Sequence, residues 1–327
     1  MTSVRGNAAA QAAFAAALNS GALHHAWLIA GAEGVGKMRF AEQAALRMLA
    51  EASIQAPLPP GGHVPEAHPA RALVVAGSHP DLRILKRLPK DPDKPDQDMA
   101  RSISIAQVRG LQPMFATSPS MGPRRVVIID SIDDLERPGA SNALLKNLEE
   151  PPAGTIFLLV SHAPGRLLPT IRSRCRMLRF DALAAADVAA VVRAARPEAD
   201  DAEVMALVAA GEGSPGRALR YAGLDVAGID AAIAGVAADG DPRNLRRIKL
   251  SKALSGKAAQ PRYEAFLERA PAYIARAAQG RRGAALAAAL DAHAAARDLA
   301  GAATGLSLDP QATVFEMAGI VARLHAG

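Results

Sequence analysis

The chain has 327 residues, half of them hydrophobic and only 3% aromatic, so it is long enough for two or three domains with substantial cores. Its formal charge of +6 comes from dispersed basic residues rather than a long Lys/Arg block. A single cysteine, Cys175, excludes an intramolecular disulfide and a zinc site built from several thiolates. No window approaches the roughly 20 strongly apolar residues of a membrane span. We therefore expect a cytoplasmic protein.

The first motif along the chain is a phosphate-binding loop. Residues 26–30 read Ala-Trp-Leu-Ile-Ala, which predicts a buried strand, and residues 37–50 have a helical pattern. Gly-Ala-Glu-Gly-Val-Gly-Lys between them matches the P-loop pattern, whose backbone N–H groups cradle phosphates. The candidate nucleotide-binding residues of this loop are Gly31, Gly34, Gly36 and Lys37.

The loop departs from the P-loop pattern at its last position. A P-loop has Ser or Thr after its lysine, because that hydroxyl binds the Mg²⁺ that bridges the phosphates. Met38 stands there instead, and a thioether is a poor ligand for magnesium. The loop keeps what holds phosphate but lacks one part needed for hydrolysis. We expect at most ATP or ADP binding in a degenerate site, with no cofactor required.

Two features follow before the next apolar run. The charged, proline-rich stretch from Leu85 to Ala100 predicts a mobile surface loop with little packing. Ser104 and Gln107 then have the spacing of a capping box, which predicts the start of a helix.

Two further apolar runs predict strands of the same sheet. Residues 126–129 lead into Asp130, and residues 156–160 lead into Ser161. Between them, residues 142–150 predict a helix that ends at two prolines. Strands that alternate with helices indicate a parallel α/β sheet, with polar residues gathered at one edge.

The polar residues at this edge have candidate roles in a nucleotide site. Asp130 fits the acidic position that supports the metal shell in P-loop proteins. Hydrolysing members usually follow it with Glu, whereas this chain has Ser131, which cannot act as the base at neutral pH. Asp133 and Asp134 are alternatives for that base, but a solvated loop carboxylate or a helix cap is the more common role. Ser161 is a candidate γ-phosphate sensor, or simply a strand-ending serine.

After Phe180 the pattern changes to helices alone. In the run Gly213-Ser-Pro-Gly-Arg-Ala-Leu219, the serine is a predicted N-cap and the proline a first helical residue, which places Arg217 in the first turn. Asp309-Pro310 predicts the start of a final helix. The expected domains are an α/β P-loop domain over 1–180, a small helical lid over 181–223 and an all-α domain over 224–327.

Two longer motifs give a specific resemblance. Residues 142–152 read Asn-Ala-Leu-Leu-Lys-Asn-Leu-Glu-Glu-Pro-Pro, and residues 168–175 read Leu-Pro-Thr-Ile-Arg-Ser-Arg-Cys. Together with His25-Ala-Trp-Leu28, Gly77-Ser-His-Pro-Asp-Leu82 and the run at 213–217, they resemble the clamp-loader branch of the AAA+ ATPases, whose signature is Ser-Arg-Cys. The resemblance covers roughly the first 220 residues.

The resemblance implies a division of labour between subunits. Arg174 would act in trans as an arginine finger on ATP bound by a neighbouring motor subunit, while a solvated basic cluster with Arg172 and Arg176 is the plain alternative. Arg217 matches the sensor arginine of the lid. The implied partners are the gamma/tau motor subunit, the delta subunit, the sliding clamp and primer–template DNA, bound without sequence specificity. The C-terminal helices would form the collar that joins the subunits.

Two rival functions are kept. An active gamma/tau-like motor would have a hydroxyl at position 38, Glu at position 131 and usually a four-cysteine zinc module within residues 53–78, a stretch that has no cysteine. We therefore expect no zinc, with His63 and His68 exposed on a proline-rich loop. A freestanding P-loop kinase would need its own acceptor site and no Ser-Arg-Cys triplet. The preferred hypothesis is a stator that hydrolyses no ATP alone.

Overall fold

The computed structural model of the chain describes residues 4–21, 23–54, 56, 58, 63–91, 93 and 99–325. Its residues divide into two units by their contacts. The first unit contains residues 1–199 and 211–218, and the second contains residues 200–210 and 219–327. The division into three domains stays a prediction.

A parallel sheet forms the centre of the first unit. Its strands are β1 (Ala26–Gly31), β2 (Leu82–Lys86), β3 (Arg125–Asp130), β4 (Thr155–Ser161) and β5 (Arg176–Phe180). Within the described residues, the strand order is β2-β3-β4-β1-β5, with every pair of neighbours parallel. The three central strands are almost wholly buried, as expected for a sheet covered on both faces. The strands predicted before the P-loop, Asp130 and Ser161 are confirmed.

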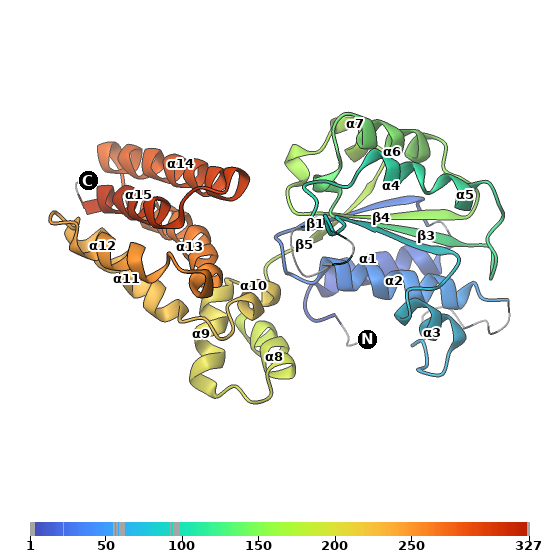
Figure 1. Ribbon diagram of the computed structural model, residues 1–327. Coiled ribbons are helices and arrows are strands. Elements are labelled where there is room, and N and C mark those ends of the chain that lie inside the picture. Colours follow the sequence, from blue (N-terminus) through green and yellow to red (C-terminus); the bar gives the residue numbers. More distant parts are fainter. Residues whose placement is uncertain are drawn as a thin grey trace. The chain divides into compact units, whose positions relative to one another are not determined.

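Helices cover both faces of this sheet (Figure 1). On one face lie α1 (Ala8–Asn19), α2 (Lys37–Glu51) and α3 (Pro69–Val75). On the other lie α4 (Ile105–Arg109), α5 (Gln112–Phe115), α6 (Gly139–Glu149) and α7 (Pro169–Arg172). Phe14 of α1 stacks edge-on against Trp27 of β1 at 5.1 Å and against Phe40 of α2 at 5.4 Å, so the few aromatic residues join helices to sheet.

The predicted loop from Leu85 to Ala100 begins too early. Leu85 is only 8% exposed and pairs with Ile129 in the sheet, because β2 continues to Lys86. Beyond β2 the chain returns, and Pro89 forms an antiparallel bridge with Met99. Residues 92 and 94–98 of the predicted loop lie outside the described residues. Ser104 and Gln107 then form the predicted capping box at α4.

Within residues 53–78, where a zinc module would lie, His68 connects two segments of the chain. The Nδ1 atom of His68 accepts a hydrogen bond from the Ala70 amide and so caps α3, and its Nε2 lies 2.7 Å from the Ala56 carbonyl oxygen. His68 is 5% exposed, so the expectation of an exposed side chain is wrong for this residue. His63 is exposed as expected. The described residues contain no group of three or more His, Cys, Asp or Glu suited to a metal ion.

Among the described residues, only helices follow β5, as the sequence pattern predicts. They are α8 (Ala185–Ala195), α9 (Asp201–Gly211), α10 (Pro215–Arg220), α11 (Val226–Asp239), α12 (Leu245–Ala253), α13 (Gln260–Ala278), α14 (Gly283–Leu306) and α15 (Pro310–Ala322). Asp309 caps α15 by accepting a hydrogen bond from the Ala312 amide at 2.8 Å, which confirms the predicted start. In the second unit, Phe266, Ile274 and Val314 are fully buried. Among the described residues, no helix meets the length and hydropathy needed to cross a bilayer.

Candidate functional site

The P-loop leaves β1 through glycines in left-handed conformations. Gly34 has φ of +78° and Gly36 has φ of +96°, conformations that glycine adopts without the steric cost of a side chain. Gly36 is the N-cap of α2, so the positive end of that helix faces the loop. These are the features that a phosphate cradle requires.

Lys37 is turned inward onto the loop itself. Its side chain is buried, and its ammonium donates to the carbonyl oxygens of Gly31 at 2.7 Å and Ala32 at 2.5 Å. Burial lowers the pKa of Lys37 to about 8, although the nearby charges of Asp130 and Glu33 act to raise it. An incoming phosphate would have to compete with these two carbonyl groups for the lysine.

Asp133 connects the ends of β3 and β4. Its carboxylate accepts hydrogen bonds from the Ser131 hydroxyl at 3.1 Å, the Ser161 hydroxyl at 3.0 Å and the His162 amide at 2.6 Å. Asp133 is half-buried, and its carboxylate is bound by protein groups, which a freely solvated loop carboxylate would lack. The hydroxyl of Ser161, a residue with no exposed surface, is directed at this carboxylate. The contacts make Asp133 a structural link between the two strands.

Asp130 and His162 share a partly buried charged environment with Lys37. Burial raises the pKa of the Asp130 carboxyl, and the nearby His162 and Lys37 oppose that rise. Burial also lowers the pKa of His162, and the charge of Lys37 adds to the effect. Sequence reasoning missed His162, because a histidine after a strand-ending serine has no recognisable pattern.

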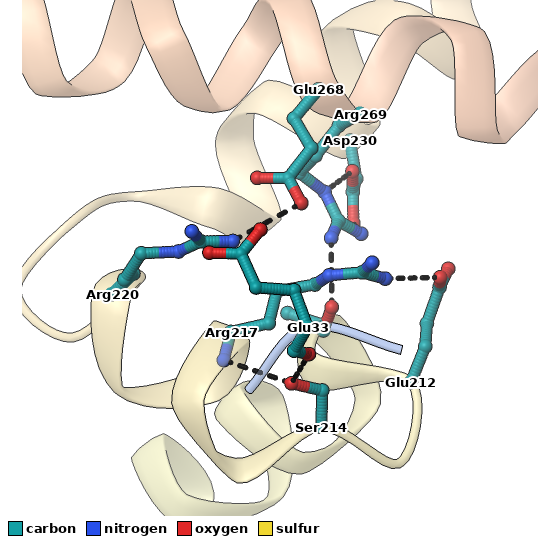
Figure 2. A network of polar contacts seen from close by, with 9 residues as sticks. Glu33, Glu212, Ser214, Arg217, Arg220, Asp230, Glu268 and Arg269 are labelled. Atoms are coloured by element: carbon teal, nitrogen blue, oxygen red, sulfur yellow. Dashed lines mark hydrogen bonds and ion pairs between the residues drawn. The ribbon is translucent and has the colours of Figure 1, made fainter. Parts of the chain in front are cut away.

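The segment 211–218 packs directly on the P-loop within the first unit. The Ser214 hydroxyl donates to the Glu33 carbonyl oxygen at 2.8 Å (Figure 2). The Gly216 amide donates to the Gly34 carbonyl oxygen at 2.9 Å. The Ser214 hydroxyl also accepts a hydrogen bond from the Arg217 amide at 3.1 Å, as the predicted N-cap requires. One serine therefore both starts α10 and anchors it to the loop.

Arg217, the candidate sensor arginine, is held beside this contact. Its guanidinium pairs with the Glu212 carboxylate at 3.0 Å, and its side chain is 26% exposed (Figure 2). Glu212 has a positive φ of +49° in the tight turn before α10, which brings its carboxylate next to Arg217. The predicted placement of Arg217 in the first turn of a helix is confirmed.

The Ser-Arg-Cys triplet forms a turn between α7 and β5. The Ser173 hydroxyl and the Arg174 guanidinium both donate to the Thr170 carbonyl oxygen, at 3.1 and 2.9 Å. Cys175 packs against the core beneath α6 and α7, and burial raises the pKa of its thiol to about 12. The serine and cysteine thus fix the turn, while the Arg174 side chain stays 34% exposed.

Arg174 and the P-loop lie at opposite edges of the sheet. The P-loop follows the carboxyl end of β1, whereas Arg174 precedes β5, whose first residue pairs with Trp27 near the start of β1. Glu149, which binds Arg174 at 2.7 Å, ends α6 beside His25, as the contact between His25 Nε2 and the Leu148 carbonyl oxygen at 3.1 Å shows. A strand of this length spans roughly 20 Å at about 3.3 Å per residue.

The predicted site residues therefore fall into two groups. The structure brings together the P-loop residues, Asp130, Ser161 and the segment that carries Arg217 at the carboxyl edge of the sheet. Arg174 belongs to the other edge. Arg172 and Arg176 are exposed, and the Arg176 guanidinium lies 5.1 Å from the Trp27 ring centroid.

Comparison with known proteins gives the family. The family model described as "DNA polymerase III, delta subunit" matches residues 6–184, more than half of the chain. A DNA polymerase III subunit delta' from Pseudomonas aeruginosa is 39% identical over 46% of this chain and 41% of its own length. The Bacillus subtilis delta' subunit is 35% identical over 49% of this chain and 43% of its own.

A differently named relative and a solved structure are also similar. The tau subunit from Salmonella typhimurium is 33% identical over 52% of this chain and 24% of its own length. The structure of a DNA polymerase III gamma subunit-related protein from Thermotoga maritima aligns with 96% of this chain and 99% of that chain, at 15% identity and a TM-score of 0.42. The chain spans less than half the length of the curated relatives it matches. On the family match and the two delta' relatives, the chain belongs to the DNA polymerase III delta-subunit family, on its delta-prime branch.

Proposed function

We propose that the chain is a clamp-loader subunit of the delta-prime kind, a stator that acts on ATP bound by a neighbouring motor subunit. The observation that carries this proposal is the position of Arg174 at the sheet edge opposite to the chain's own P-loop. An arginine side chain cannot span the sheet, so this cation is available to a neighbour and not to its own loop.

The chain's own nucleotide site supports a degenerate role. Met38 offers no hydroxyl to a magnesium ion, and Ser131 replaces the glutamate that would polarise water. The structure adds that Lys37 binds the loop's own carbonyl oxygens and that the Ser161 hydroxyl is bonded to Asp133. Two positions with an expected role in hydrolysis are therefore substituted, and the side chains of Lys37 and Ser161 are hydrogen-bonded to protein groups.

The proposed chemistry in trans is electrostatic. Negative charge on the transferring γ-phosphoryl group is redistributed in the transition state. A guanidinium placed next to these oxygens stabilises that charge. Arginine fingers of this kind contribute roughly 10³ to 10⁵ in rate. Arg174 would thus accelerate hydrolysis at a site that it does not belong to.

The proposed partners follow from this role. They are the gamma/tau motor subunit, the delta subunit, the sliding clamp reached through the complex, and primer–template DNA contacted through its phosphates. The helices after residue 223 would supply the collar that joins the subunits. Membership of this complex would make the chain a component of the DNA polymerase III holoenzyme in the cytoplasm.

The alternative function is a gamma/tau-like motor, because a tau subunit is also among the similar proteins. The two functions differ in the activity of the purified chain. Steady-state ATPase of the chain alone should stay at background, and Lys37→Ala should not lower it. Robust turnover that Lys37→Ala abolishes would instead establish the motor. A freestanding kinase would fail to co-elute with the motor subunit on size exclusion.

A further inference from the structure

The guanidinium of Arg174 is held from two sides by its own chain. One terminal nitrogen, Nη2, binds the Glu149 carboxylate at 2.7 Å, and the other, Nη1, donates to the Thr170 carbonyl oxygen at 2.9 Å. Glu149 ends α6, and Thr170 belongs to α7, so two separate helices fix one side chain.

We infer that Glu149 is a positioning residue, which aims the Arg174 guanidinium at the phosphoryl group of the neighbouring subunit's nucleotide. This inference rests on the proposed function of Arg174. A guanidinium has five N–H donors in a rigid plane, and the two contacts found among the described residues use two of them. The remaining donors are enough for an anion to bind without breaking either contact.

The pair has the properties of an orienting contact rather than a stabilising one. The side chains of Arg174 and Glu149 are 34% and 48% exposed, and ion pairs this accessible contribute little to folding. Without Glu149, the long arginine side chain would sample many rotamers, and each loss of alignment at a reacting centre lowers the rate. The pair therefore acts on the geometry of the cation more than on the stability of the fold.

Electrostatics alone predicts the opposite effect on the hydrolysis rate, and the experiment separates the two effects. A carboxylate beside Arg174 reduces the positive field at a nearby phosphate, so its removal would raise the rate if field strength decided the outcome. If alignment decides it, removal lowers the rate. The two hydrogen bonds that bracket the guanidinium favour alignment.

The test uses the complex reconstituted with the motor subunit and measures steady-state ATP hydrolysis with primed DNA and the clamp. Glu149→Gln keeps the size of the side chain and an acceptor oxygen but removes the charge. We expect kcat to fall roughly tenfold with KM unchanged, because the nucleotide site belongs to the motor. The kcat of the Glu149→Ala variant should fall further, because alanine keeps no acceptor for the guanidinium. Glu150→Gln, at the next and also exposed position, is the matched control and should keep the wild-type rate.

Two further proteins make the outcomes distinguishable. Arg174→Ala tests the proposed function, and an unchanged kcat in that variant would show that Arg174 is not an arginine finger. If Arg174→Ala lowers kcat, then a wild-type or raised rate for both Glu149 variants would overturn the positioning role alone. The double variant Arg174→Ala with Glu149→Gln should be no slower than Arg174→Ala, because Glu149 acts only through the arginine. A further loss in the double variant would also overturn the inference.

Discussion

At the scale of single residues, the most consequential feature is that Lys37 is bound by its own loop. Its ammonium lies between the carbonyl oxygens of Gly31 and Ala32 and is almost inaccessible to solvent. The P-loop spacing in the sequence identifies Lys37 as a candidate phosphate-binding residue, but it does not predict the orientation of its side chain. The carbonyl groups that compete for the ammonium belong to the backbone and have no sequence signal.

The depressed pKa of Lys37 has a consequence for stability. The folded state holds this group at a pKa of about 8, whereas the unfolded value is about 10.4. Between these values the unfolded chain binds more protons, so the contribution of Lys37 to folding becomes more favourable as pH rises, by at most about 1.4 kcal/mol per pH unit. Below about pH 8 the cost of the buried charge is fully present.

Urea unfolding of the wild type and Lys37→Met at about pH 7.5 and about pH 10 measures this effect. The stability of the wild type relative to the variant should increase by roughly 1–3 kcal/mol over that interval. A difference that stays constant with pH would show that the lysine is not held as described.

Asp133 gives a second prediction at this scale. Asp133→Ala removes the acceptor of the buried Ser161 hydroxyl and should lower the free energy of unfolding by about 1–3 kcal/mol. Asp134→Ala is the control, because Asp134 makes an accessible ion pair with Arg87 at 3.2 Å and should cost less than about 1 kcal/mol. Equal losses in urea unfolding would contradict the role of Asp133 as a link between strands.

At the scale of elements, the contact between the P-loop and the segment 211–218 depends on the absence of a side chain at Gly34. A Cβ atom there would lie 2.4 Å from the Ser214 hydroxyl oxygen and 3.0 Å from the Arg217 amide nitrogen. Gly77 has a similar positive φ of +67°, but a Cβ atom there would meet nothing within 4 Å. Alanine substitutions at these two glycines therefore separate the cost of backbone strain from the cost of steric overlap.

Gly77→Ala should therefore lower the free energy of unfolding by about 1–2 kcal/mol, because alanine is strained in the left-handed conformation. Gly34→Ala should cost about 1–3 kcal/mol more, because it also displaces the start of α10. Urea unfolding gives both values, and amide exchange of residues 211–218 should accelerate only in Gly34→Ala. Equal costs, with unchanged exchange, would mean that the segment does not pack on the loop.

The elements show where sequence patterns suffice. The strands before the P-loop, Asp130 and Ser161 are continuous apolar runs, and the caps at Ser104 and Asp309 have fixed spacing. The sequence does not predict β2, because it is an edge strand in which only Leu82 and Leu85 are buried. The other edge strand, β5, has the same mixed burial, and only its first residue, Arg176, has a sequence-based interpretation, as part of a basic cluster.

The candidate site divides in the same way. Side chains in fixed motifs, such as Lys37, Arg174 and Arg217, could be named from the sequence because their spacing is constant. The partners that orient them could not be named, because Glu149 lies 25 positions before Arg174 and no spacing rule joins the two. Tertiary contacts of this kind depend on the register of strands and helices that the sequence does not specify directly.

At the scale of the whole molecule, the proposed function places two nucleotide sites at opposite ends of the parallel strands. The chain's own degenerate site would lie at the carboxyl ends, and Arg174, at the amino ends, would serve a neighbour's nucleotide. Assembly should therefore not depend on Arg174. Arg174→Ala is expected to co-elute with the motor subunit on size exclusion as the wild type does, and loss of co-elution would assign the arginine to the interface instead.

The most direct test is the steady-state ATPase rate of the reconstituted complex that contains wild-type chain, Arg174→Ala or Arg172→Ala. Arg172 is an exposed arginine two positions earlier and serves as the control. We predict that Arg174→Ala lowers the DNA- and clamp-stimulated rate by roughly 10³-fold or more at the sites that border this chain, while Arg172→Ala changes it little. Equal rates for the wild type and Arg174→Ala in an intact complex would contradict it.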